Sequence, residues 1–326
     1  MRRRATASLA LLAASCGRYA DFSLPPPPAD QPARSFRWSA RAEPVLGRDR
    51  ARDVLNPSVV KKDGVYYNFY SLFDGAVCHT ELATSADGVT WEKGGRILSP
   101  DAATWEGRYI AANGAALWSG HEWVYWYQAG PREQPRIGLA RSASGRTWRK
   151  HPAPVLETGP RGSWDERGVA DPYVVRTGDF FYLYYLGQDR ARRQRLGVAR
   201  SHDGVRWEKL RTNPVLELGG PREFDENGLG EPAVWQSHGA WWMLYTGRDR
   251  TEHRRLGLAR SSDGVRWEKL PAVYSGSAPW MSRVTCDPSV IVEGGAIRVW
   301  FGGGNLPSPD ENLNGQIGLA LLEPEP

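Results

Sequence analysis

The sequence predicts an all-β protein, a five-bladed β-propeller, and three observations support this prediction. Among 326 residues there are 15 Trp, 13 Tyr and 36 Gly, a composition that favours strands and tight turns over helices. A seven-residue turn motif that ends in Trp occurs four times, and a strand opening led by Asn, Asp or Glu occurs five times at a similar spacing. Units of four short strands that repeat radially form a propeller.

Residues 1–15 are predicted to be a signal peptide. The stretch "MRRRATASLALLAASC" has a basic start, a short apolar stretch and small residues before Cys16, which is how a secretory signal is built. The ending "LAASC" resembles the lipobox of bacterial lipoproteins, so we expect lipidation of Cys16 and membrane anchoring through it. Secretion without a lipid and a cytoplasmic start are the alternatives. We therefore expect an extracytoplasmic protein, either a bacterial cell-envelope lipoprotein or a secreted one.

Residues 16–34 are Pro-rich and polar and are predicted to form an extended tether in front of a propeller that spans 35–326. The formal charge is +5, and removal of Arg2, Arg3 and Arg4 with the signal leaves about +2. Because this charge is small for the length of the chain, we expect no nucleic-acid partner. We expect a monomer.

The turn motif reads "SADGVTW", "SASGRTW", "SHDGVRW" and "SSDGVRW", ending at Trp91, Trp148, Trp207 and Trp267. A D-G or S-G pair between two alternating segments is typical of a tight hairpin. We expect each motif to connect the third and fourth strands of a blade, with its Trp packed between blades.

The strand openings place the blade starts near residues 56, 113, 171, 231 and 287. The fifth unit ends without a turn motif, and "RWSARAEPVLG" at 37–47 matches "TWRKHPAPVLE" at 147–157 in length and pattern. The N-terminal strand is therefore predicted to complete the last blade. This closure would leave no long unpaired strand edge.

The first strand of each blade lines the channel of a propeller, so the residues that open these strands should meet at one mouth. They are Asn56, Asn113, Asp171, Glu231 and Asp287. Carboxylates that face each other raise one another's pKa, which keeps one protonated while its neighbour is ionised. Such a pair suits cleavage of a glycosidic bond. The alternative for each acid before Pro is a turn cap without a chemical role.

On these motifs the chain resembles the five-bladed propeller glycosidases, which include families 43 and 62, families 32 and 68 and, more distantly, family 130. In them an Asp that opens blade one is base or nucleophile, an Asp that opens blade three orients and tunes, and a Glu that opens blade four is general acid. "ADP" at Asp171 and "GEP" at Glu231 stand in the third and fourth blades. The resemblance implies a carbohydrate substrate, with Glu231 as general acid.

The blade-one position departs from this pattern because it holds Asn56, and an amide is neither a useful base nor a nucleophile. Asp53 or Asp287 could supply the missing carboxylate. We expect a glycoside hydrolase that acts on an oligo- or polysaccharide. The alternatives are a carbohydrate-binding propeller without activity and a phosphorylase, in which inorganic phosphate attacks as in family 130.

Further substrate contacts are expected at the same mouth. Asn56 and Asn113 open strands there, and Trp105 and Trp280 are candidate sugar platforms, with core packing as the alternative. His79 lies near the funnel in the aligned repeats. Arg195 belongs to arginine-rich loops that suit an acidic or phosphorylated sugar, or that are solvated and balanced by neighbouring acids.

Cys78 and Cys286 remain if Cys16 is lipidated. We expect two free thiols, with a disulfide as the alternative. The six His show no metal-ligand spacing, so neither a metal ion nor another cofactor is expected, although members of family 43 can carry a central ion.

Overall fold

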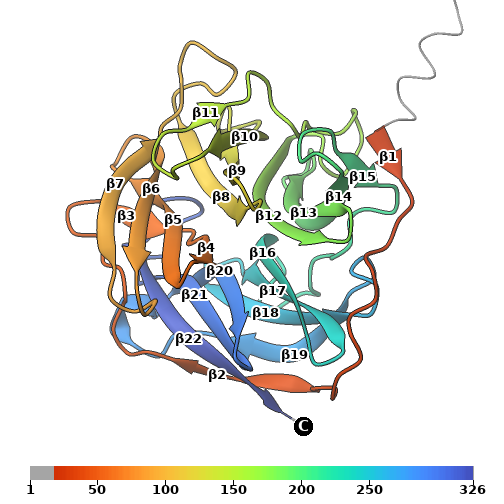
Figure 1. Ribbon diagram of the computed structural model, residues 1–326. Helices are drawn as coiled ribbons and strands as arrows, with labels where there is room; N and C mark the ends of the chain where they lie inside the picture. Colours follow the sequence, from red (N-terminus) through yellow and green to blue (C-terminus); the bar gives the residue numbers. More distant parts are fainter. Residues whose placement is uncertain (1–17, 326) are drawn as a thin grey trace, which may run out of the picture.

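The computed structural model describes residues 18–325 as an all-β domain in which groups of strands are arranged around a common centre (Figure 1). The signal peptide predicted for 1–15 and the lipidated Cys16 lie outside the described residues. Over residues 18–325, no helix is long and apolar enough to span a membrane. A short 3-10 helix, η2, covers Pro279–Met281.

The strands form consecutive, mainly antiparallel groups. The first group holds β3 (Asp53–Leu55), β4 (Val59–Lys62), β5 (Val65–Phe73), β6 (Cys78–Ser85) and β7 (Glu92–Leu98). The second holds β8 (Ile110–Trp118), β9 (Trp123–Ala129), β10 (Arg136–Ser142) and β11 (Arg149–Lys150). The third holds β12 (Gly168–Thr177), β13 (Phe180–Gln188), β14 (Gln194–Ser201) and β15 (Glu208–Leu210), with β1 (Tyr19–Ala20) at its edge.

The fourth group holds β16 (Gly228–Ser237), β17 (Ala240–Arg248), β18 (Arg254–Ser261) and β19 (Glu268–Tyr274). The fifth holds β20 (Val284–Glu293), β21 (Ala296–Gly304), β22 (Gln316–Glu325) and the N-terminal β2 (Ser35–Ala40). β2 pairs antiparallel with β22 over its whole length. A strand near the N-terminus and the C-terminal strand thus lie side by side in one sheet, as the sequence predicts.

The turn motif connects strands within a group and seals the space between groups. In the motif of the third group, Gly204 has a φ of +72°, and its N–H donates to Ser201 Oγ at 2.9 Å. The Gly204 carbonyl accepts hydrogen bonds from Trp207 in the same motif and from Trp126 in the second group. The two indoles meet edge to face at 6.2 Å. This confirms the prediction that the motif Trp packs between repeats.

The loops that precede β8, β12 and β16 are each anchored by a buried ion pair. In the fourth group Asp225, 1% exposed, accepts hydrogen bonds from Lys269 Nζ at 2.5 Å and from the Tyr245 hydroxyl at 3.2 Å. The equivalent trios are Glu106, Lys150 and Tyr127, and Asp165, Lys209 and Tyr185. Each acid lies six or seven residues before a strand opener, so the trio fixes the segment that presents that residue.

The segment before β2 corrects the prediction of a free tether. β1 adds in parallel to β15, and the Leu24 N–H donates to the Asp263 carbonyl at 2.8 Å. The Leu24 side chain is 2% exposed in the core between the third and fourth groups. The chain is extended, as predicted, but it runs along the outer edge of the domain (Figure 1), because the open edge of β15 and an apolar pocket for Leu24 hold it there.

Candidate active site

The strand openers share an unusual backbone conformation. Asn56, Asn113, Asp171, Glu231 and Asp287 have φ values of 48–51°. In the last four, the pairing register shifts at this point, as in a β-bulge, which re-aims a side chain. Asn and Asp tolerate this left-handed region better than other residues with a side chain. Glu has no such preference, so the presence of a Glu at position 231 is explained better by a role for its carboxylate than by its backbone conformation.

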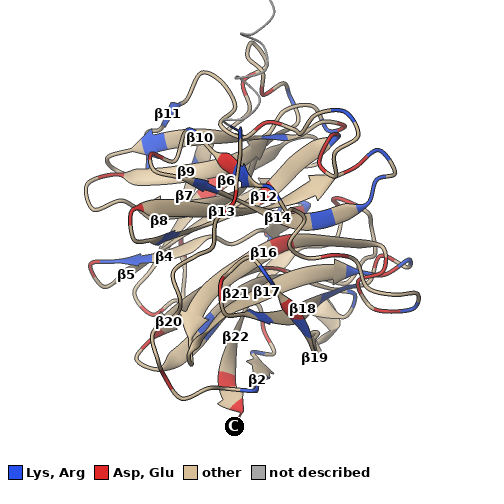
Figure 2. Ribbon diagram, turned by 90° about the vertical axis from the view of Figure 1, so that its right-hand side faces the viewer, with Lys and Arg blue, Asp and Glu red and all other residues tan. Residues whose placement is uncertain are grey.

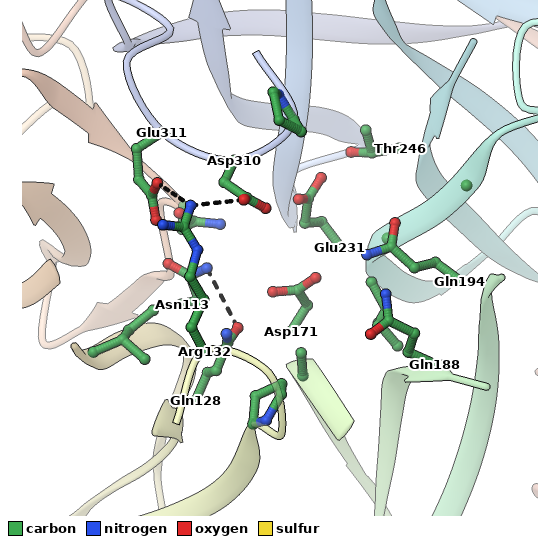
Figure 3. Close-up of a pocket in the computed structure, with 18 of the residues that line it drawn as sticks. Asn113, Gln128, Arg132, Asp171, Gln188, Gln194, Glu231, Thr246, Asp310 and Glu311 are labelled. Carbon is green, nitrogen blue, oxygen red and sulfur yellow. Dashed lines mark hydrogen bonds and ion pairs between the residues drawn. The ribbon is translucent and has the colours of Figure 1, made fainter. Parts of the chain in front are cut away.

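All of these openers line one cavity of about 470 Å³ at the centre of the domain. Figure 3 shows Asp171 and Glu231 next to each other in it, with Asn113 and Gln128 on one side and Gln188 and Gln194 on the other. Residues from every strand group contribute to the wall. The convergence that the repeat spacing predicts is therefore present.

Asp171, Asp287 and Glu231 form a carboxyl cluster, and the buried Arg254 lies beside it. Burial and then the charge of Glu231 raise the pKa of Asp171 to about 8. The same two causes raise the pKa of Asp287 well above its ordinary value. Burial lowers the pKa of Arg254, but the charges of Glu231 and its neighbours outweigh this and raise it. The cluster therefore holds at least one proton at neutral pH.

Asp287 lies where the fifth group meets Asn56. Its Oδ2 accepts hydrogen bonds from the Asn56 backbone N–H and from the Cys286 thiol, both at 3.1 Å. Oxygens of Asp287 and Glu231 and the Cys286 sulfur lie within 4.8 Å of one another, so together these three groups could hold a metal ion. Oε2 of Glu231 is buried, and no residue of the described range donates a hydrogen bond to it. It is available to a ligand.

Asp53 lines the cavity but does not fit the role of substitute base. Its carboxylate accepts hydrogen bonds from the backbone N–H groups of Asn312, Leu313 and Gly315 at 2.6, 2.9 and 2.8 Å. The side chain is 3% exposed. Because both oxygens bind these amides, Asp53 anchors the loop between β21 and β22.

Trp105 and Trp280 are not among the cavity-lining residues, which corrects their prediction as sugar platforms. Trp105 packs against the core between the first and second groups. Trp280 stacks on Phe301 at 6.2 Å and donates its Nε1–H to the Ala42 carbonyl. Core packing, the alternative considered for both, is what the structure shows.

His79 and Arg195 also lie outside the cavity lining. The buried His79 ring lies 2.9 Å from Ser99 Oγ and 3.2 Å from Asp74 Oδ2. Arg195 is 8% exposed and forms an ion pair with Asp189 at 2.9 Å. Neither side chain lines the cavity, and both bind polar neighbours outside it.

Most arginines of the loops are paired with acids, as one of the alternatives proposed. Arg190 pairs with Glu166 at 3.2 Å, and Arg255 pairs with Asp249 at 2.9 Å. Figure 2 shows basic and acidic residues close together on these loops. The arginines in the cavity wall are Arg132, Arg167, Arg190, Arg192, Arg248 and Arg254.

Sequence reasoning missed the loop between β21 and β22, of which Pro309, Asp310 and Glu311 line the cavity. The signal was present, because this loop of the fifth unit stands where the second, third and fourth units have their arginine-rich loops. Cys78 and Cys286 are both free and buried, as expected.

Comparison with known proteins identifies relatives. Residues 56–286 match the family described as Glycosyl hydrolases family 32 N-terminal domain. An uncharacterized protein of Mycobacterium tuberculosis is 31% identical over 229 residues, which are 65% of this chain and 75% of that protein. A 1,2-beta-oligomannan phosphorylase of Thermoanaerobacter sp. is 29% identical over 129 residues, 37% of this chain and 43% of that protein.

Solved structures share the fold. A β-1,2-mannobiose phosphorylase from Listeria innocua superposes with a TM-score of 0.71 at 10% identity, covering 88% of this chain and 97% of the other. A thermostable family-43 glycoside hydrolase gives 0.63 at 18% identity, covering 84% and 93%. The match over 56–286 contains four of the five strand openers and reaches Cys286, next to Asp287. The chain therefore belongs to the family of the Glycosyl hydrolases family 32 N-terminal domain, with the propeller fold of glycoside hydrolases.

Proposed function

We propose that this protein is a glycoside hydrolase that cleaves glycosidic bonds of an oligo- or polysaccharide at the carboxyl cluster. The observation that carries the proposal is the meeting of Asp171, Glu231 and Asp287 in one cavity, from three neighbouring strand groups, beside the buried Arg254. A group of acids that retains a proton near neutral pH can both donate a proton and act as a carboxylate.

Glu231 is the general acid in this proposal. Its unpartnered Oε2 can approach the glycosidic oxygen. Oxygens of Glu231 and Asp287 lie within 4.8 Å of each other, and burial and the charge of Glu231 raise the pKa of Asp287. When Glu231 carries the proton, the donors from Asn56 and Cys286 stabilise the charge on Asp287. Asp171 orients and tunes the pair through its own raised pKa.

Asp287 supplies the carboxylate that Asn56 does not. It activates water or attacks the anomeric carbon, while the proton from Glu231 goes to the leaving oxygen and the glycosidic bond breaks. Asp287 is preferred over Asp53 because Asp287 faces Glu231, whereas Asp53 binds three backbone amides.

The test compares the wild type with Glu231→Gln on arabino-, xylo-, fructo-, uronic-acid and β-1,2-manno-oligosaccharides. Loss of general acid catalysis lowers the rate by roughly 10²–10⁴-fold. Glu268→Gln is the matched control, because Glu268 is an exposed residue that pairs with Arg260 on the surface. Full activity of Glu231→Gln would contradict the assignment.

Phosphorolysis is the second candidate. It is favoured by Asn56 at the blade-one position, by the arginines of the cavity wall, and by the TM-score of 0.71 with a mannobiose phosphorylase. In this reaction inorganic phosphate attacks the anomeric carbon and the product is a glycosyl phosphate. Turnover that requires added phosphate would select it over hydrolysis. Saturable sugar binding without any turnover would instead indicate a carbohydrate-binding propeller.

We further propose that the strand groups are the five blades of one propeller and that β2 completes the last blade. The pairing of β2 with β22 supports this. For the cell, we propose a signal peptide at 1–15 and a monomeric lipoprotein anchored through Cys16. Incorporation of labelled fatty acid that disappears in Cys16→Ser is the expected result.

A further inference from the structure

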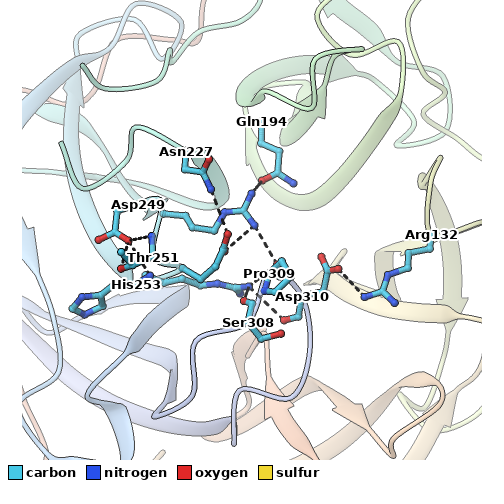
Figure 4. Close-up of polar contacts among 12 residues, drawn as sticks. Arg132, Gln194, Asn227, Asp249, Thr251, His253, Ser308, Pro309 and Asp310 are labelled. Carbon is cyan, nitrogen blue, oxygen red and sulfur yellow. Dashed lines mark hydrogen bonds and ion pairs between the residues drawn. The ribbon is translucent and has the colours of Figure 1, made fainter. Parts of the chain in front are cut away.

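The loops around the cavity mouth are joined to one another by side-chain contacts (Figures 3 and 4). Arg132, in the loop between β9 and β10, forms ion pairs with Asp310 at 2.7 Å and Glu311 at 2.8 Å, both in the loop between β21 and β22. The Arg132 guanidinium also lies over the Tyr109 ring at 5.2 Å. This contact links the second group directly to the fifth and bypasses the short loop 74–77 of the first.

The loop between β21 and β22 is held firmly at the other side as well. Arg254 donates to the carbonyls of Ser308 at 3.0 Å and Pro309 at 2.9 Å, and Arg248 donates to the Pro309 carbonyl at 3.2 Å. Asp53 binds the amides at the far end of the same loop. The loop is therefore a fixed wall of the cavity.

The contacts continue around the mouth. Arg248 donates to Gln194 Oε1 at 2.7 Å, which links the fourth group to the third. Arg192 and Glu133, 3.7 Å apart, link the third group to the second. Together with Arg132 and the loop between β21 and β22, these contacts form a closed ring, which we call the rim ring.

A glycan that binds in mid-chain needs a groove open on two sides, so that the chain can enter and leave across the reacting bond. The rim ring closes the sides of the cavity and leaves entry along the axis of the domain. We infer that the protein acts on chain ends and releases the terminal sugar unit, and that Arg132 determines this specificity. The inference rests on the proposed cleavage of glycosidic bonds.

The experiment measures product sizes over time for the oligosaccharides of the panel above, each offered unmodified and with both ends chemically blocked. The wild type is expected to release only terminal units and to leave the blocked substrates intact. Arg132→Ala is expected to cleave the blocked substrates and to release internal products that the wild type does not form. Arg37→Ala is the matched control, because it breaks an exposed ion pair between Arg37, near the N-terminus, and Glu323, near the C-terminus. Its products are expected to match those of the wild type.

The double variant Asp310→Asn, Glu311→Gln breaks the same link from the other loop and serves if Arg132→Ala does not fold. Internal products from the wild type would overturn this inference and leave the proposed function standing. Terminal products only from both opened variants would overturn the role of Arg132 and the rim ring. No turnover of any substrate by the wild type would overturn the proposed function, and this inference with it.

Discussion

Replacing Asp171 by Asn should change how the stability of the fold depends on pH. Burial and the charge of Glu231 raise the pKa of Asp171 from 3.8 to about 8. Between these values the folded state holds a proton that the unfolded state has lost, so the free energy of unfolding falls as the pH rises through this window. Asn carries no such proton, so the variant should lack this contribution.

The magnitude follows from the same values. Each pH unit between the two pKa values corresponds to about 1.4 kcal/mol, so Asp171 lowers the stability by at most about 4 kcal/mol between pH 5 and pH 8. This is a large part of the roughly 5–15 kcal/mol that stabilises a typical domain. Asp171→Asn should therefore gain stability relative to the wild type as the pH rises.

Urea unfolding followed by Trp fluorescence at pH 5, 6, 7 and 8 measures this difference. Asp203→Asn is a control without pH dependence in this range, because burial raises the pKa of Asp203 but hydrogen bonds from the Arg206 and Val205 amides outweigh it and lower the pKa below 3.8. Asp203 is therefore ionised in both the folded and the unfolded state throughout pH 5–8, so the difference between Asp203→Asn and the wild type should stay constant over this range. A constant difference in stability between Asp171→Asn and the wild type at all four pH values would contradict this prediction. It would show that folding does not raise the pKa of Asp171.

Two further predictions concern stability alone. Lys269→Met leaves the buried Asp225 without its cation and should lower the free energy of unfolding, measured with urea, by about 3–5 kcal/mol. An unchanged unfolding midpoint would mean that the ion pair does not anchor its loop. Leu24→Ala should lower the free energy of unfolding by about 2–5 kcal/mol, because Leu24 is 2% exposed. The control Leu306→Ala changes an exposed residue and should cost almost nothing. Equal effects of the two substitutions would show that the N-terminal segment is not bound to the domain.

Much of the fold could be predicted because each repeat is locally encoded. The turn motif ending at Trp207 specifies a hairpin through its own hydrogen bonds, since Gly204 adopts a positive φ and Ser201 binds its amide. The strand opener also has a local signature, because Asn and Asp tolerate the left-handed backbone that the bulge requires. The regular spacing of these two signals then predicts which residues meet at one mouth.

The residues that the sequence misplaced depend on contacts between distant segments. Asp53 was a candidate base because it is close to Asn56 in the chain, but loop amides about 260 residues away occupy its oxygens. Trp280 was a candidate platform because it lies shortly before the strand opener Asp287, yet it stacks on Phe301. Spacing predicts the neighbourhood of a side chain but not the direction in which it points.

By itself the sequence determined the all-β architecture, the repeat, and the set of acids that converge, because strand periodicity and turn chemistry are properties of short segments. Tertiary structure alone decided which carboxylate faces Glu231 and which loops close the cavity mouth. Asp287 and Arg132 acquire their roles from partners in other repeats. Burial raises the pKa of Asp171 and Asp287, and these residues become buried only once the strand groups have assembled around the cavity.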